Sequence, residues 1–100
     1  MSDKKDKIRQ EQRRLQQAYE EKLTDLTRQQ RQIEQQAQET AQRGSYWLHK
    51  VDPTATNQEV YHLVEEYQAQ TQDIITHQRR QISNEYEQQS TALRRKLEEQ

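Results

Sequence analysis

The stretch GSYWLHKVDPT, from Gly44 to Thr54, interrupts a chain whose composition is otherwise that of helix. It contains the only glycine, the only proline (Pro53) and the only tryptophan (Trp47) among the 100 residues. Glycine is favoured just after a helix end, and proline cannot continue a helix. The sequence therefore predicts a helix over about 4–43, a turn over about 44–55 and a second helix over about 56–98.

Apolar side chains recur at steps of three and four residues on both sides of this turn, which is the period of a helix with one apolar face. After the turn, steps of eleven residues connect Val64, Ile75, Tyr86 and Leu97. Such a spacing is typical of nearly straight helix pairs. A connection this short folds the second helix back along the first, so the predicted fold is all-α, an antiparallel two-helix hairpin of the coiled-coil kind.

The ends of the two helices carry recognisable signals. Gly44 follows Arg43 as a C-terminal helix glycine would. Two starts for the second helix stay open, a capping box from Thr56 to Glu59 or a proline at the first helical position, Pro53. Matching the two apolar stripes gives a register in which Ala41 lies opposite Val60, Ala37 opposite Val64, Tyr19 opposite Ile82, Leu15 opposite Tyr86 and the polar Gln30 opposite Thr71.

The composition leaves little material for a core. Apolar residues make up 28% of the chain and charged residues 33%, and Gln alone occupies 20 positions. Two helices with one apolar stripe each are marginally stable by themselves, because ordering the chain opposes most of what burial contributes. We therefore expect a partner or a second copy to complete the core.

Several function classes lack support in the sequence. No catalytic Ser, His and Asp arrangement is recognisable, so no enzyme activity is expected. His62 and Glu66 could bind one ion from a single helix face, but no third ligand is apparent, and neither a metal nor another cofactor is expected. Acidic residues interleave with the basic ones near the N-terminus, which argues against nucleic-acid binding.

The chain contains no apolar run long enough to span a membrane and no recognisable signal peptide. With no cysteine, it also has no disulfide or thiolate metal site. We expect a cytoplasmic protein, or one exported together with a client by a route that needs no signal peptide.

The aromatic and aliphatic residues around the turn form the candidate partner-binding site. One interpretation of Trp47 is a local plug, packed over the small Ala37 and Ala41. The other is a surface that binds a protein partner. The residues assigned to that surface are Tyr46, Trp47, Leu48, Tyr61, Leu63 and Tyr67.

A hairpin of this length with an aromatic turn, a first helix rich in Gln, Glu and Arg, and the segment EVYHLVEEY (residues 59–67) resembles the small WXG-like proteins of type VII secretion. More narrowly, it is similar to the helical accessory proteins encoded beside LXG polymorphic toxins in Gram-positive bacteria. The resemblance implies a client, the helical N-terminal region of an LXG toxin, and allows a second small helical accessory protein.

The chain departs from the WXG pattern at two places. Trp47 is followed by Leu48 and His49 instead of x-Gly, and Tyr86 is followed four residues later by Ser90 instead of an acidic residue. These departures favour a targeting adaptor over a direct export signal. The alternative is a self-associating structural coiled coil, such as a phage or cytoskeletal spacer, in which the Ile and Leu stripe forms a homo-oligomer interface.

Overall fold

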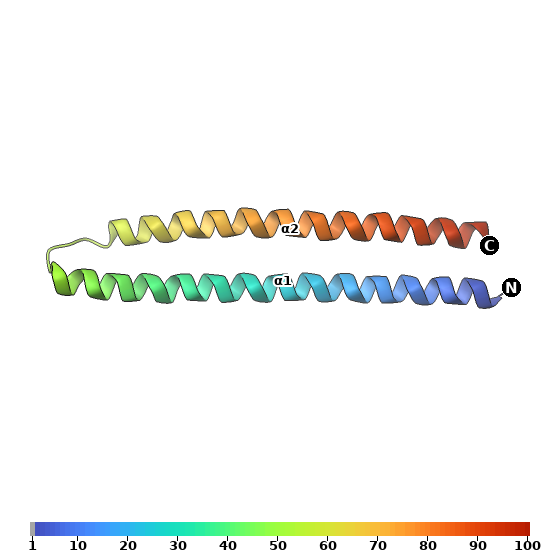
Figure 1. The fold of residues 1–100 in the computed structure, drawn as a ribbon, viewed down its shortest axis with the longest axis horizontal. Helices are drawn as coiled ribbons and strands as arrows, with labels where there is room; N and C mark the ends of the chain where they lie inside the picture. The colour runs from blue at the N-terminus through green and yellow to red at the C-terminus, as the bar shows by residue number, and fades with distance from the viewer. Residues whose placement is uncertain (1) are drawn as a thin grey trace. The chain divides into compact units, whose positions relative to one another are not determined.

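The computed structural model describes residues 2–100. It contains two helices, α1 (Ser2–Val51) and α2 (Gln58–Glu99), and no strand among the described residues. The chain reverses direction at the segment 52–57 (Figure 1), so the predicted all-α helical hairpin is confirmed. Contacts divide the chain into two units. Unit 1 combines α1 up to Leu26 with α2 from His77, and unit 2 comprises Thr27–Thr76.

The predicted end of the first helix at residue 43 is wrong, because α1 continues through Gly44 to Val51. Gly44 has no positive φ, so it does not form the left-handed cap that glycine provides at helix ends. The last helical hydrogen bond runs from the Asp52 N–H to the Leu48 carbonyl, at 2.8 Å. Pro53 follows directly, and its ring disfavours helical backbone at the residue before it. The proline, not the glycine, ends α1.

The connection is a hydrogen-bonded turn around Pro53. The Ala55 N–H donates to the Asp52 carbonyl at 3.0 Å, which places Pro53 at the second position of a β-turn. The Asp52 carboxylate accepts bonds from the Thr54 hydroxyl at 2.7 Å and from the Thr54 N–H at 3.1 Å. These two bonds hold the pKa of Asp52 below its ordinary value of 3.8. Both predicted starts of the second helix are therefore wrong, since Pro53 and Thr56 belong to the connection.

Asn57 is the residue that starts α2. Its carbonyl accepts the N–H of Tyr61 at 2.9 Å, the first hydrogen bond of the helix. Its side-chain oxygen accepts the hydroxyl of Ser45 from α1, at 2.6 Å. This bond joins the last turns of α1 to the beginning of α2.

Unit 1 has large side chains between its helices. The rings of Tyr19 and Tyr86 stack with centroids 4.3 Å apart and planes 16° apart. The hydroxyl groups of Tyr19 and Ser83 lie within hydrogen-bond distance, at 3.1 Å. The predicted partner of Tyr19 is Ile82. Tyr19 contacts instead Ser83, which is one residue beyond Ile82, and Tyr86, which is about one helical turn beyond it. A tyrosine ring is long enough to span that offset, which the sequence register did not include.

Unit 2 has a smaller core. Ile75 is its most deeply buried residue, with 2% of its surface exposed, and Ala37 is the other buried one. The Gln30 side chain donates to Gln72 at 2.8 Å, and Gln72 is the neighbour of Thr71, the residue that the predicted register places opposite Gln30. A polar layer is therefore present at Gln30.

Candidate functional site

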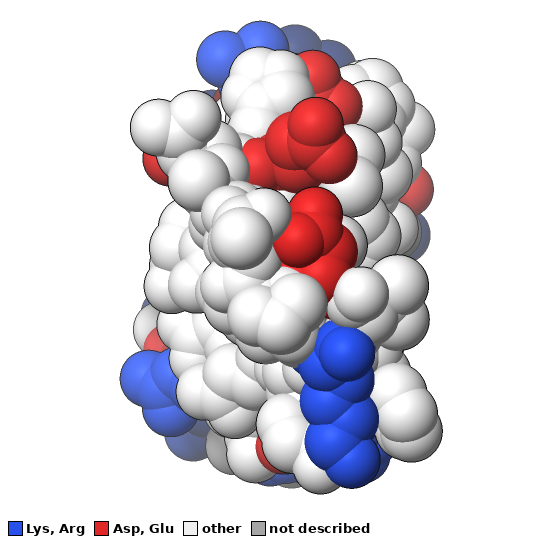
Figure 2. Space-filling model, turned by 90° about the vertical axis from the view of Figure 1, so that its left-hand side faces the viewer, with Lys and Arg blue, Asp and Glu red and all other residues white. Residues whose placement is uncertain are grey.

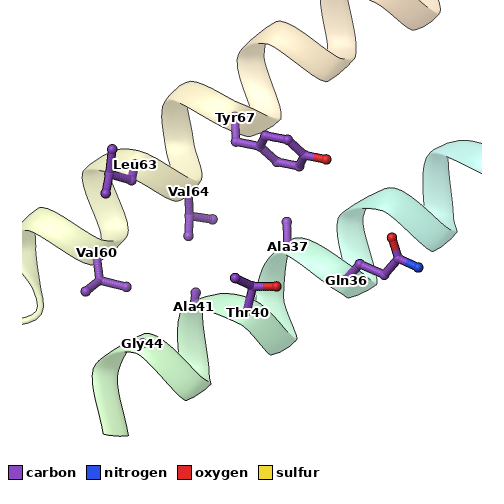
Figure 3. A pocket seen from close by; sticks show the side chains of 9 residues that line it. All are labelled: Gln36, Ala37, Thr40, Ala41, Gly44, Val60, Leu63, Val64 and Tyr67. Carbon is purple, nitrogen blue, oxygen red and sulfur yellow. The ribbon is translucent and has the colours of Figure 1, made fainter. Parts of the chain in front are cut away.

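An apolar groove of about 510 Å³ lies between α1 and α2 in unit 2 (Figure 3). It is open to solvent along one side of the helix pair and ends close to the turn. Side chains from both helices line it: Gln36, Ala37, Thr40, Ala41 and Gly44 from α1, and Val60, Leu63, Val64 and Tyr67 from α2.

The floor of the groove consists of small residues at helical spacing. Ala37, Ala41 and Gly44 recur at steps of four and three, which places them on one face of α1. Figure 3 shows Val60 and Val64 pointing from α2 toward this face. A Cβ atom added at Gly44 would meet nothing within 4 Å. The groove exists because side-chain volume is missing here.

Large apolar side chains of α2 border the groove and face solvent. Leu63 is 65% exposed and Tyr67 49% exposed. Ile74, seven residues beyond Tyr67, is 59% exposed and continues the same helical stripe. Fully burying a side chain of this size contributes about 1.5–3 kcal/mol. In the isolated chain these side chains remain largely in water and contribute only part of that stabilisation. The stripe of Leu63, Tyr67 and Ile74 therefore resembles a protein interface without its partner.

Trp47 does not plug the helix pair, and that interpretation is wrong. Its side chain is 61% exposed, because α1 continues past Gly44 and Trp47 projects from the helix into solvent instead of folding back from a turn. Its ring meets that of Tyr46 edge to face, with centroids 5.7 Å apart. The ammonium group of Lys50 lies over both rings, 4.9 Å from Tyr46 and 5.5 Å from Trp47. Trp47 follows Thr40 by seven residues, so it shares the groove side of α1.

The six predicted partner-binding residues do not form one patch. Leu63 and Tyr67 lie together at the groove, and Trp47 lies on the same side of α1. Tyr46 follows Gly44 by two residues, which turns it to the far side of α1 at about 100° per residue. Tyr61 lines a second, more polar hollow, and Leu48 is half-buried.

Several residues of this surface lie outside the predicted site. Val51, which the sequence places in the turn, is 83% exposed at the end of α1. Ile74 lies eleven residues beyond Leu63, the same step that connects the residues of the buried stripe, so repeating that step from Leu63 identifies it. Gly44, predicted to be a helix end, lines the floor of the groove.

Polar chemistry at this site is sparse. His62 Nε2 lies 3.1 Å from Glu66 Oε1, and both side chains are exposed. Over residues 2–100, no three His, Cys, Asp or Glu side chains come together in a way that could hold a metal ion. The same residues contain no helix long and apolar enough to cross a membrane. What the surface offers is apolar area with charged borders, which suits the binding of another helix.

No family model matches the chain, and comparisons with curated proteins and with solved structures found no match.

Proposed function

We propose that this hairpin is a non-enzymatic adaptor whose unit 2 binds a helix of a client protein. The client we propose is the helical N-terminal region of an LXG-type toxin, which the adaptor would help to direct to type VII secretion. The observation that carries the proposal is the exposed apolar stripe of α2 beside an open groove.

The stripe and the groove complement each other as a site for a helix. An amphipathic helix presents apolar side chains at steps of three and four residues, and such a ridge fits between two helices whose facing residues are small. Ala37 and Ala41 leave room for that ridge, while Leu63 and Tyr67 would cover its flank. Binding would bury surface that the hairpin leaves in water.

The position of the exposed residues favours an adaptor over a structural spacer. Among the residues the structure describes, every exposed large hydrophobic side chain belongs to unit 2. A spacer that self-associates along its length would need such residues in unit 1 as well. There the large apolar side chains are buried or half-buried.

The choice of client is supported by sequence resemblance. A short helical hairpin with aromatic residues close to its turn is similar to the accessory proteins of LXG toxins, which bind the helical N-terminal region of the toxin. In this chain the aromatic residues at the end of α1, next to the turn, are Tyr46 and Trp47, and both are exposed.

The test is a binding titration with the N-terminal region of the LXG-type toxin encoded beside this protein. Replacing Leu63→Ala and Tyr67→Ala together should weaken binding at least tenfold, because about 1.4 kcal/mol of lost burial corresponds to one factor of ten. Tyr61→Ala is the matched control, a tyrosine of α2 that is 60% exposed and does not line the groove. It should change affinity less than about twofold, and circular dichroism should show all variants helical.

Two results would overturn the proposal. One is the absence of binding to the toxin region at micromolar concentrations. The other is a stable oligomer of the isolated protein, seen by light scattering and lost in the Leu63→Ala and Tyr67→Ala variant. The second result would identify the protein as a self-associating structural coiled coil.

A further inference from the structure

Two rows of charged residues border the groove, one on each helix. On α1, Arg43 and Lys50 continue a seven-residue step that begins at the groove-lining Gln36. On α2, Glu59, Glu66 and Asp73 follow the same seven-residue step. Seven residues are close to two helical turns, so each row stays on one side of its helix.

Each row lies next to residues that line the groove. Arg43 follows Thr40 by three residues, and residues three apart are neighbours on a helix surface. Glu66 follows Leu63 by the same step, and Glu59 precedes Leu63 by four residues. The α2 border of the groove is therefore acidic, and its α1 border carries Arg43 and Lys50 together with one acidic residue, Glu39, which is three residues beyond Gln36.

Most of these charges have no partner of opposite charge within the hairpin. Over residues 2–100, Arg43, Glu59 and Asp73 make no ion pair. Glu66 meets only the exposed His62, and Lys50 rests over two exposed aromatic rings. Figure 2 looks onto the turn end and shows acidic side chains at the front of the upper half and a basic side chain at the front of the lower half, with further basic side chains along the top edge. These charges can meet a ligand at little cost to the hairpin.

We propose that this pair of borders fixes the direction in which a client helix lies in the groove. The occupant is a single amphipathic helix with an apolar ridge, an acidic flank beside Arg43 and Lys50, and a basic flank beside Glu59, Glu66 and Asp73. Reversing the helix end for end exchanges its flanks and brings like charges together. The inference rests on the proposed adaptor function and adds the chemistry and the direction of the bound helix.

A single helix fits this surface better than a second copy of the chain. Two copies related by a two-fold axis present the same patch to each other. Such a pair would set one hollow against another, whereas one helix fills the hollow with its own ridge. The charged borders then attract a helix that carries acidic residues on one flank and basic residues on the other, an arrangement that an amphipathic helix can have.

The test uses the full hairpin and a designed helical peptide of about three heptads, the repeat length that keeps one face toward a partner. The peptide has Leu along its apolar ridge, Glu along one flank and Lys along the other, and a nitroxide label at its N-terminus. Paramagnetic broadening of backbone amide signals then reports which end of the groove the label occupies. We expect broadening near Gln30 or near Val51, which lie about 30 Å apart along α1 at 1.5 Å per residue, but not near both.

The decisive variant reverses the borders, with Arg43→Glu, Lys50→Glu, Glu59→Lys and Glu66→Lys. It should move the broadening to the opposite end of the groove. A peptide of the same composition with Glu and Lys mixed on both flanks should bind the unaltered hairpin about five- to tenfold more weakly and broaden both ends, since several exposed charge pairs are lost together.

Several outcomes would overturn the inference: broadening at both ends with the two-flank peptide, an unchanged direction in the reversed variant, no peptide binding, or a dimer that excludes the peptide. The adaptor function is tested separately by the toxin region and the Leu63→Ala and Tyr67→Ala variant. If toxin binding depends on Leu63 and Tyr67 but does not change in the charge-reversed variant, only the inferred direction of the bound helix is refuted, and the adaptor function stands.

Discussion

Units 1 and 2 are built from the same two helices but differ in the size of the side chains that face each other. In unit 1, Tyr19 and Tyr86 stack between the helices, and Ile8 and Leu26 are buried. In unit 2, the corresponding face of α1 carries Ala37, Ala41 and Gly44, while large apolar residues of α2 remain in solvent. Periodicity is the same in both units, so the difference arises from side-chain volume alone.

This contrast separates two tasks along one hairpin. Large paired side chains bury area within the molecule and hold the helices together. Small residues leave a groove, and the large side chains beside it become available to a partner. A helix pair can therefore bury its large apolar side chains in one unit and leave them exposed to a partner in the other, without any change of secondary structure.

The largest effect is expected from the isoleucine that forms the core of unit 2. Ile75→Ala should lower the free energy of unfolding by about 3 kcal/mol, because it leaves a cavity at a residue that is only 2% exposed. Ile74→Ala is the matched control, the adjacent isoleucine at 59% exposure. It should change stability by less than about 0.5 kcal/mol. Urea denaturation followed by circular dichroism measures both, and equal effects would mean that unit 2 has no core of its own.

The next effect concerns the aromatic pair of unit 1. Tyr86→Ala should lower the free energy of unfolding by about 2 kcal/mol, since it removes the stack on Tyr19 together with half-buried apolar area. Tyr61→Ala in unit 2 removes a tyrosine that is 60% exposed and should cost less than about 0.5 kcal/mol. The same urea titration compares them. If Tyr61→Ala lowers the free energy of unfolding more than Tyr86→Ala does, the stack of Tyr19 and Tyr86 does not hold the helices of unit 1 together.

A smaller effect tests the floor of the groove. Gly44→Ala should raise the free energy of unfolding by about 0.5–1 kcal/mol, because alanine favours helix and its Cβ meets nothing within 4 Å. The mirror change in unit 1 is Ala18→Gly at an exposed helical position, which should lower stability by about the same amount. Thermal unfolding measures both. If Gly44→Ala destabilises the protein, Gly44 is needed for its backbone and not for the space it leaves.

The sequence predicted the hairpin but not the ends of its helices. Periodic apolar residues and the absence of Gly and Pro from the flanking segments were sufficient for two helices and a reversal. The predicted end of α1 is wrong because it treats Gly44 as a helix-ending residue. A glycine inside a helix lowers its stability by only about 1 kcal/mol. Long flanking helical segments outweigh that cost. Pro53 was the stronger signal, because it acts on the backbone of the residue before it.

The candidate site was predicted in part for a related reason. The cluster of aromatic and aliphatic residues around the turn predicts Leu63 and Tyr67 as part of the site, and both lie at the groove. Tyr46 and Trp47 were placed in a turn, where the direction of a side chain cannot be derived from spacing. Because α1 extends to Val51, both residues are helical, and each residue turns the side chain by about 100° around the helix axis. This rotation places Tyr46 on the far side of α1 and Trp47 on the groove side. Side-chain direction thus depended on one helix boundary.

The smallest effect concerns the turn that joins the two helices of unit 2. Bonds from Thr54 keep the pKa of Asp52 below 3.8, so the folded state favours the ionised carboxylate. Asp52 therefore contributes stability above the pKa of the unfolded chain, and this contribution is lost as pH falls through the lowered folded pKa. Asp52→Asn should lower the melting temperature slightly at pH 7 and leave it unchanged at a pH below the lowered folded pKa, where the carboxyl group is protonated in the folded and in the unfolded chain.

Thr54→Ala separates this charge effect from a general weakening of the turn. It removes the hydroxyl donor while the backbone N–H of residue 54 remains, so the pKa of Asp52 should rise toward its ordinary value. A carboxyl ¹³C titration of Asp52 in both proteins measures the change directly. An identical titration in the two proteins would show that the Thr54 hydroxyl does not hold the carboxylate. The turn would then depend on Pro53 and on the bond between Ser45 and Asn57.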